Sequence, residues 1–355
     1  MKQLIVWFLS VIYVSPVALG DVPRTPAGQP DLTGNYDSGS LTPEERPRIF
    51  GKNQFMTAKQ AERMKTGLVS ALQTAASRIS DPNRSAPVKG GDGNNGAGAG
   101  GVGGYNSFWI DPGDHVLDID GKFRTSIVYD PPNGRKPSMT AKGRFKTADN
   151  FSSFTHDNDG TASWLERDGP GPFDDPEELA LAERCLLGFS AGPPMLPNGF
   201  YNNNYTIVQT PDHIMIMTEQ VHDVRIIRMG EREPLPEHIR PWMGDSWGRW
   251  EGDVLVVETT NLPTAQLNKH GYIYPGGSEG MKVIERFTRA DENTINYEFT
   301  VVDPGTYTAE WGGEVPMKAL EGLIYEYACA EGNYALGNIL RGARYQERME
   351  AENQR

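Results

Sequence analysis

Beyond residue 20 the sequence contains no hydrophobic run long enough to cross a membrane. The one long apolar stretch, Leu4 to Leu19, follows the positive charge of Lys2 and ends in Ala18-Leu19-Gly20. This small-x-small ending is typical of a signal-peptidase site. We therefore predict a signal peptide over residues 1–20 and an exported protein, periplasmic or secreted, with no membrane span after cleavage. An uncleaved N-terminal anchor is the alternative.

Cysteine is also scarce, since the 355 residues include only Cys185 and Cys329. No further cysteine or histidine stands at a zinc-ligand spacing from either one, which argues against metal binding by the pair. In an oxidising compartment an even pair predicts a disulfide, here closing a loop of about 144 residues. A catalytic thiol is the less favoured interpretation, because exported free thiols tend to oxidise.

Positive charge is in deficit, with 34 lysines and arginines against 47 aspartates and glutamates and a net charge of −13. Nucleic acid and anionic membranes are therefore poor partners, because both require a cationic footprint. The six histidines show no HxH or HxxxH spacing, and we predict no metal site. A GxGxxG match at Gly96, Gly98 and Gly101 lacks the strand and the helix that phosphate binding requires, so we predict no cofactor.

Turn-forming residues are abundant, with 26 prolines and 40 glycines, as all-β folds require. Runs rich in β-branched and aromatic residues predict strands at 123–130, 204–210, 213–219, 223–229, 253–260, 282–289, 294–302 and 323–329. Short connections between them predict antiparallel pairing. We predict a mainly β fold, an antiparallel meander that forms a lipocalin-like barrel or a sandwich, with a few peripheral helices.

Helical spacing of apolar residues after Thr57, with Gln60 in a capping-box position, predicts an amphipathic helix over 57–79. A second helix is predicted over 176–187, with Cys185 near its end. The expected organisation is a signal peptide (1–20), an N-terminal region of an arm, one helix and a Gly-rich loop (21–104), a β domain (105–345) and a polar tail (346–355).

Several long motifs resemble a large family of exported bacterial β-rich proteins with no established reaction. They include RTSIVYDPPNGR (124–135), GPPMLPNG (192–199), WMGDSWGRWEGDVLVVETTN (242–261) and YEYACAEGNY (325–334). The resemblance covers about two thirds of the mature chain. It implies export and a β-rich fold, and it carries no catalytic assignment.

Polar residues inside apolar strands are candidates for chemistry, because burying them is costly unless they are paired. Five carboxylates in separate strands, Glu219, Glu258, Glu285, Glu298 and Glu326, either line a polar cavity or lie on a solvated outer face. The predicted catalytic residues are His222, Glu219, Arg225 and Asp245. His222 is a candidate base, although Asp223 can orient it only if a bend interrupts the strand.

Indoles are concentrated just before the strand at 253–260, where Trp242 and Trp247 either form a stacking platform or plug one end of a barrel. With Asn203 and Tyr205 they make up the predicted ligand-binding residues. We therefore expect a hydrolase or lyase with an acid–base mechanism, acting on a carbohydrate or other small metabolite. The alternative functions are a non-catalytic barrel that binds a small apolar or aromatic ligand, and a structural role in the envelope.

Overall fold

The computed structural model describes residues 22–76, 112–154, 162–166, 171, 173–179, 181–182, 184–199, 202–231, 233–263 and 277–353. The predicted signal peptide and the Gly-rich loop lie outside these ranges. Within them, no helix is long and apolar enough to cross a membrane.

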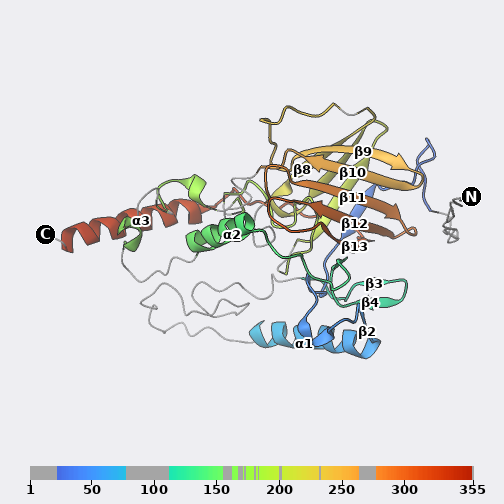
Figure 1. Cartoon of the computed structure of the whole chain (residues 1–355), viewed down its shortest axis with the longest axis horizontal. Helices are drawn as coiled ribbons and strands as arrows, with labels where there is room; N and C mark the ends of the chain where they lie inside the picture. The colour runs from blue at the N-terminus through green and yellow to red at the C-terminus, as the bar shows by residue number, and fades with distance from the viewer. Residues whose placement is uncertain are drawn as a thin grey trace, which may run out of the picture.

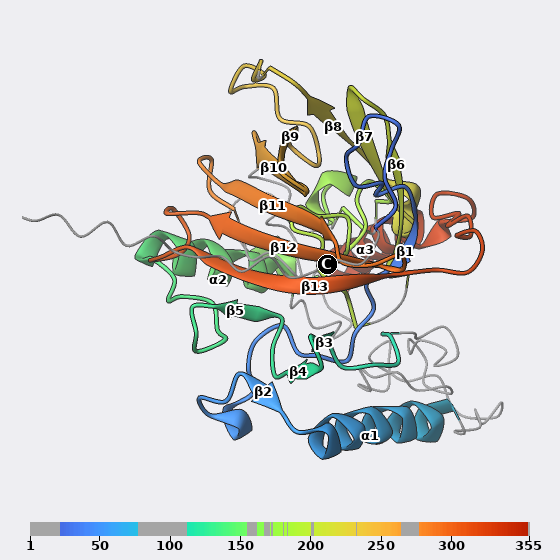
Figure 2. The same ribbon diagram turned by 90° about the vertical axis from the view of Figure 1, so that its right-hand side faces the viewer.

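The dominant element is a closed β-barrel (Figures 1 and 2). Its strands are β1 (Gly34–Asp37), β6 (Asn204–Gln209), β7 (His213–Thr218), β8 (Val224–Met229), β9 (Asp245–Glu251), β10 (Val254–Thr260), β11 (Lys282–Arg289), β12 (Thr294–Val302) and β13 (Trp311–Ala319). They pair in that order, and β13 pairs back onto β1. Only the β8–β9 pairing is parallel, and β5 (Val128–Asp130) adds to β13 outside the closed ring. The predicted barrel is confirmed, rather than the sandwich.

Successive side chains of each strand point alternately inward and outward. The large side chains that point into the barrel form one hydrophobic core. Its aromatic rings contact one another in series, with centroids 5.0 Å apart for Phe287 and Tyr297, 5.9 Å for Tyr297 and Phe299, and 5.6 Å for Phe299 and Trp311. Each of these four side chains is at most 1 % exposed. No water-sized space therefore adjoins them, and this part of the interior is a packed core.

Smaller elements surround the barrel. They are a sheet of β2 (Phe55–Met56), β4 (Lys122–Arg124) and β3 (Asp118–Ile119), and the helices α1 (Ala58–Ala76), α2 (Ala141–Phe154) and α3 (Tyr334–Asn353). Figure 2 shows the small sheet and α1 together below the barrel, and Figure 1 shows α3 extending away from it. The predicted capping box of α1 is present, because the Thr57 N–H donates to Gln60 Oε1 (2.8 Å) and the Gln60 N–H to Thr57 Oγ1 (3.3 Å).

Two predicted elements are wrong. Instead of a helix over 176–187 there is one short 3-10 turn, η4 (Pro176–Glu178), after which Leu179 is extended and Cys185 takes a left-handed conformation. The segment 323–329 is not a strand, and its Leu323 and Tyr325 side chains are 89 % and 85 % exposed. Because the β1–β13 pairing closes the barrel, this segment finds no free sheet edge to join.

Other predictions missed elements or misjudged their limits. The run 123–130 is divided between β4 and β5, and β1, β9, β13, α2 and α3 were not predicted. Most of the predicted polar tail belongs to α3, which continues to Asn353.

Candidate functional site

A distorted corner connects β7 to β8 at one end of the barrel. Its 3-10 turn η5 (Gln220–His222) contains two successive non-glycine residues with positive φ, Val221 at 63° and His222 at 49°. A β-branched residue in this region is a rare outlier, and each such residue costs on the order of 1–3 kcal/mol. This bend breaks the strand alternation. Residues Glu219 to Asp223 are called the η5 corner below.

The segment 184–199, called the cap loop below, holds the η5 corner in place. The N–H of Phe189 donates to Gln220 Oε1 at 2.7 Å, and the N–H of Gly188 donates to Asp223 Oδ2 at 3.0 Å. Gly188 permits this approach, because a Cβ there would lie 2.7 Å from the Gln220 carbonyl oxygen. The strained conformation is therefore imposed by surrounding contacts.

Glu219 anchors the other side of the corner. Its side chain is buried, and its carboxylate accepts hydrogen bonds from Asn204 Nδ2 at 2.6 Å and from the backbone N–H of Tyr325 at 3.0 Å. The second bond ties the segment after β13 to the η5 corner. Both oxygens are engaged, so the Glu219 carboxylate positions the corner.

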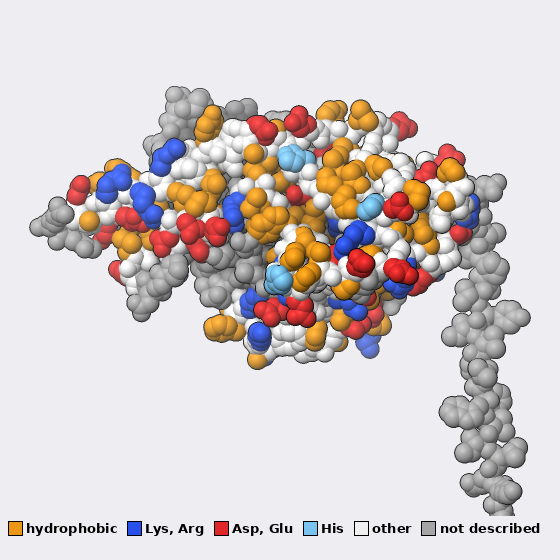
Figure 3. All heavy atoms as spheres, turned by 90° about the horizontal axis from the view of Figure 1, so that it is seen from above, with side chains coloured by type: hydrophobic (Ala, Val, Ile, Leu, Met, Phe, Trp, Pro, Cys, Tyr) orange, Lys and Arg blue, Asp and Glu red, His pale blue; other side chains and the backbone are white. Residues whose placement is uncertain are grey.

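Asp223 and His222 are the titratable groups that the corner presents. Burial raises the pKa of the Asp223 carboxyl from its ordinary 3.8 to about 6, against the opposing effects of the Gly188 N–H and of His222. His222 is exposed beside an apolar surface, since Val224 and Ile226 on β8 are 45 % and 49 % exposed. Figure 3, which views the molecule from the side where β8 and β9 lie in Figure 1, shows hydrophobic side chains gathered around histidines on this face.

Arg225 points into the barrel and forms a buried ion pair with Glu285. The two guanidinium nitrogens donate to the two carboxylate oxygens at 2.6 and 2.9 Å. The Tyr297 hydroxyl donates to Glu285 Oε1 at 2.9 Å and accepts from the Met195 N–H of the cap loop at 2.8 Å. Burial acts to lower the pKa of Arg225, but Glu285 outweighs it and the net direction is upward. Arg225 is therefore part of a structural network beneath the cap loop.

Asp245 lies at the start of β9, in a different setting. It is buried and accepts hydrogen bonds from Arg228 Nη2 and from the Leu235 N–H. The Arg228 guanidinium stacks over the Trp247 ring, 4.7 Å from its centroid. Trp242 is 37 % exposed in the preceding loop.

Asn203 and Tyr205 are buried and hold the cap loop against the barrel. Asn203 exchanges hydrogen bonds with the backbone of Asn198, at 2.8 and 3.1 Å. The Tyr205 hydroxyl donates to the Ser190 carbonyl oxygen at 2.7 Å, and burial raises its pKa. These contacts occupy both side chains within the protein.

The structure thus brings together Glu219 and His222 but separates the four predicted catalytic residues into three settings. Among the described side-chain contacts, no hydrogen bond or ion pair joins any two of His222, Glu219, Arg225 and Asp245. Sequence reasoning placed Asp223 beside His222 but left it out of the predicted site. The signal that could have identified Asp223 is its position next to His222 in the sequence. A bend in the strand would bring the two side chains to the same side.

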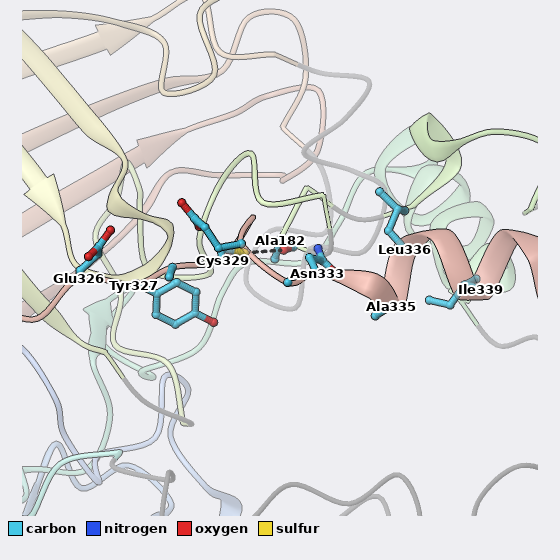
Figure 4. A pocket seen from close by; sticks show the side chains of 11 residues that line it. Ala182, Glu326, Tyr327, Cys329, Asn333, Ala335, Leu336 and Ile339 are labelled. Carbon is cyan, nitrogen blue, oxygen red and sulfur yellow. Dashed lines mark hydrogen bonds between the residues drawn. The ribbon is translucent and has the colours of Figure 1, made fainter.

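The predicted disulfide is confirmed. Cys185 and Cys329 are bonded, with Cα atoms 5.6 Å apart, and they join the cap loop to the segment that precedes α3. An open groove lies beside this bond (Figure 4) and is lined by Ala182, Glu326 to Cys329, Glu331 to Asn333, Ala335, Leu336 and Ile339. Its Glu326 end directly follows Tyr325, whose N–H bonds to Glu219. The groove and the η5 corner are therefore adjacent.

Replacing Asp223 by asparagine is expected to stabilise the protein at about pH 7 but not at about pH 4. Because the folded-state pKa is raised, this carboxyl contributes stability below its ordinary value of 3.8, and that contribution is lost as the pH rises through about 6. Asparagine retains an oxygen acceptor for the Gly188 N–H and does not ionise. Urea unfolding of both proteins at the two pH values measures the difference.

The matched control is Asp212→Asn, at the exposed turn between β6 and β7. Because the Asp212 side chain is exposed, its replacement should change the free energy of unfolding little at either pH. An equal stability difference between the Asp223→Asn variant and the parent protein at both pH values would contradict the assignment.

Neither metals nor relatives identify the site. The described part of the chain contains no group of three or more His, Cys, Asp or Glu side chains that could hold a metal ion. No protein-family model matches the chain, and no curated protein or solved structure matches it either.

Proposed function

We propose that this is an exported hydrolase or lyase that acts on a carbohydrate by acid–base chemistry, without an organic cofactor. Asp223 and His222 of the η5 corner are its proton-transfer groups. The observation that carries the proposal is the strained corner, in which buried contacts hold an exposed histidine next to a half-buried carboxyl. Conformational strain of this kind concentrates at functional sites, where the surrounding structure over-determines it.

The pKa of Asp223 suits proton transfer. With a pKa of about 6, the Asp223 carboxyl populates both its protonated and its ionised form near neutral pH. Hydrolysis requires a base that activates water and an acid that protonates the leaving oxygen. Elimination requires two groups as well. A base removes a carbon-bound proton, and an acid protonates the leaving oxygen. The Asp223 carboxyl and the neighbouring His222 imidazole are groups that can supply these two roles.

The adjoining groove supports a sugar substrate. Tyr325, next to Glu219, is 85 % exposed and offers an aromatic face for stacking on a sugar ring. Glu326, Tyr327 and Asn333 along the groove supply donors and acceptors for hydroxyl groups. The competing proposal, a ligand held inside the barrel, is disfavoured by the aromatic core that fills the interior around Tyr297 and Phe299.

The test is hydrolysis or elimination on a panel of p-nitrophenyl glycosides and soluble polysaccharides. On any substrate that is turned over, Asp223→Asn and His222→Gln are each expected to lower kcat/KM by about 100-fold or more, the usual contribution of a general acid or base. His213→Gln, which changes another exposed histidine at the start of β7, is the matched control. Activity that survives both corner substitutions, or no turnover of any member of the panel, rejects the proposal.

A further inference from the structure

The two sulfurs of the disulfide differ in their surroundings. Cys329 lines the open groove, whereas Cys185 belongs to the cap loop and does not line it (Figure 4). The groove residues around Cys329 include Ala328, which has a small side chain, and Gly332, which has none. Both cysteines are half-buried, and Cys329 is the one that a reagent in the groove has beside it.

The Cys185 sulfur has a hydrogen-bond donor beside it. Asn333 Nδ2, on the residue directly before α3, lies 3.4 Å from Cys185 Sγ. An N–H donor stabilises a thiolate, and in exchange reactions a more stable thiolate leaves faster. Cys185 also has a φ of 56°, a strained conformation for a non-glycine residue. Cys185 is thus the favoured leaving group, and Cys329 the favoured point of attack.

We propose that the Cys185–Cys329 disulfide is a site of thiol–disulfide exchange with a dithiol reductant that enters the groove. One thiolate of the reductant attacks Cys329 Sγ and forms a mixed disulfide. The Cys185–Cys329 bond breaks, and Cys185 leaves as a thiolate, which then takes up a proton. The second thiol of the reductant displaces Cys329, so the dithiol is oxidised to a disulfide and the protein disulfide is reduced to two thiols.

The structure also accommodates the reduced form. Cys329 Sγ lies 3.9 Å from the Ala182 carbonyl oxygen, so the new thiol has an acceptor nearby. Reduction removes the covalent link between the cap loop and the C-terminal segment. That segment remains held by the bond from Asn35 Nδ2 to the Gly322 carbonyl oxygen (2.7 Å) and by the Tyr325–Glu219 bond. Exchange therefore loosens α3 without releasing the barrel, and it does not depend on the proposed enzymatic activity.

The first test maps the mixed disulfide. The oxidised full chain is incubated with reduced glutathione without denaturant, free thiols are blocked with N-ethylmaleimide, and peptides are analysed by mass spectrometry. The expected result is glutathione on Cys329 and maleimide on Cys185. Glutathione on Cys185, an even distribution, or no adduct without denaturant overturns the proposal.

The second test measures the rate of reduction by dithiothreitol. Attack on the folded protein predicts a rate that increases linearly with reductant concentration, whereas a plateau at the global unfolding rate overturns the proposal. Asn333→Asp removes the donor to Cys185 and adds a negative charge, so reduction should slow about fivefold or more. The matched control is Asn338→Asp, which lies within α3 and does not line the groove, and which should keep the parent rate. Equal rates for the two variants contradict the role of Asn333.

Discussion

Replacing Glu285 by alanine is expected to lower the free energy of unfolding by about 3–5 kcal/mol, the usual cost of removing one partner of a buried ion pair. The Arg225 side chain is 2 % exposed and the Glu285 side chain 0 %, so water does not replace the lost carboxylate. The substitution also deprives the Tyr297 hydroxyl of its acceptor. Urea unfolding at neutral pH measures the loss.

Two further variants test whether the expected loss of stability arises from an unpaired buried charge. Replacing both partners, as Arg225→Met with Glu285→Met, should recover most of the stability, because no buried charge is left uncompensated. Glu251→Ala removes the carboxylate of an exposed ion pair with Arg249 and Arg286 and should lower the stability far less than Glu285→Ala does. A Glu285→Ala cost no larger than that of Glu251→Ala would show that the pair is not buried as described.

The buried pair also connects the core to the candidate site. Arg225 follows Asp223 by two residues, and the Tyr297 hydroxyl bonds to both Glu285 and the cap-loop residue Met195. The same cap loop supplies the Gly188 N–H to Asp223. A polar network with these partners favours one position of β8 and of the cap loop over others. These bonds link β8 to the cap loop beside the η5 corner.

Strands with regular alternation of apolar and polar residues were predictable from the sequence. Strands that contain glycine or proline were not. The predicted limits of β11 and β12, 282–289 and 294–302, agree with the structure. Strand β13 was missed because Gly312, Gly313 and Pro316 are unfavourable for strands. Yet the fold requires a glycine at 313, since a Cβ there would lie 2.7 Å from Cζ of the buried Phe299. Close packing in the core outweighed local propensity.

Strand carboxylates were predicted as a group, but the sequence does not give the face on which each lies. Glu285 proved to be inside the barrel, whereas Glu258 is 3.5 Å from Lys282, which is 35 % exposed, in a more open ion pair. One carboxylate is therefore paired inside the packed barrel and the other lies in a partly exposed ion pair, and neither observation shows a polar cavity. The face on which a carboxylate lies depends on the register of its strand. It also depends on bends that residues far away in the sequence hold in place.

The bend at the η5 corner is the clearest case. Nothing in Val221-His222 predicts two successive left-handed residues, because the β-branched Val221 disfavours that conformation, although histidine adopts it more often than most residues. The conformation depends on Phe189 and Gly188, more than 30 residues earlier in the chain, whose N–H groups bond to Gln220 and Asp223. Sequence reasoning could identify the cluster of titratable groups there, but not the turn that presents it.

Replacing Trp311 by alanine is expected to lower the free energy of unfolding by about 3–5 kcal/mol. Trp311 is 1 % exposed, and its ring contacts Phe299 and Tyr307 edge to face, with centroids 5.6 and 6.0 Å away. The substitution removes these contacts and leaves a cavity that the surrounding strands cannot fill. The change in the urea midpoint at constant slope measures the effect.

Trp242→Ala is the matched control, because Trp242 is 37 % exposed and should contribute far less than a tryptophan inside the barrel. Trp311→Phe tests the polar part of the side chain. The Trp311 indole N–H is buried and has no hydrogen-bond partner among the described residues, so phenylalanine removes an unpaired donor while keeping an aromatic ring in the core. This variant should therefore lose much less stability than Trp311→Ala. Equal losses for alanine at 311 and at 242 would mean that the barrel interior is not the close-packed core on which the case against an internal ligand depends.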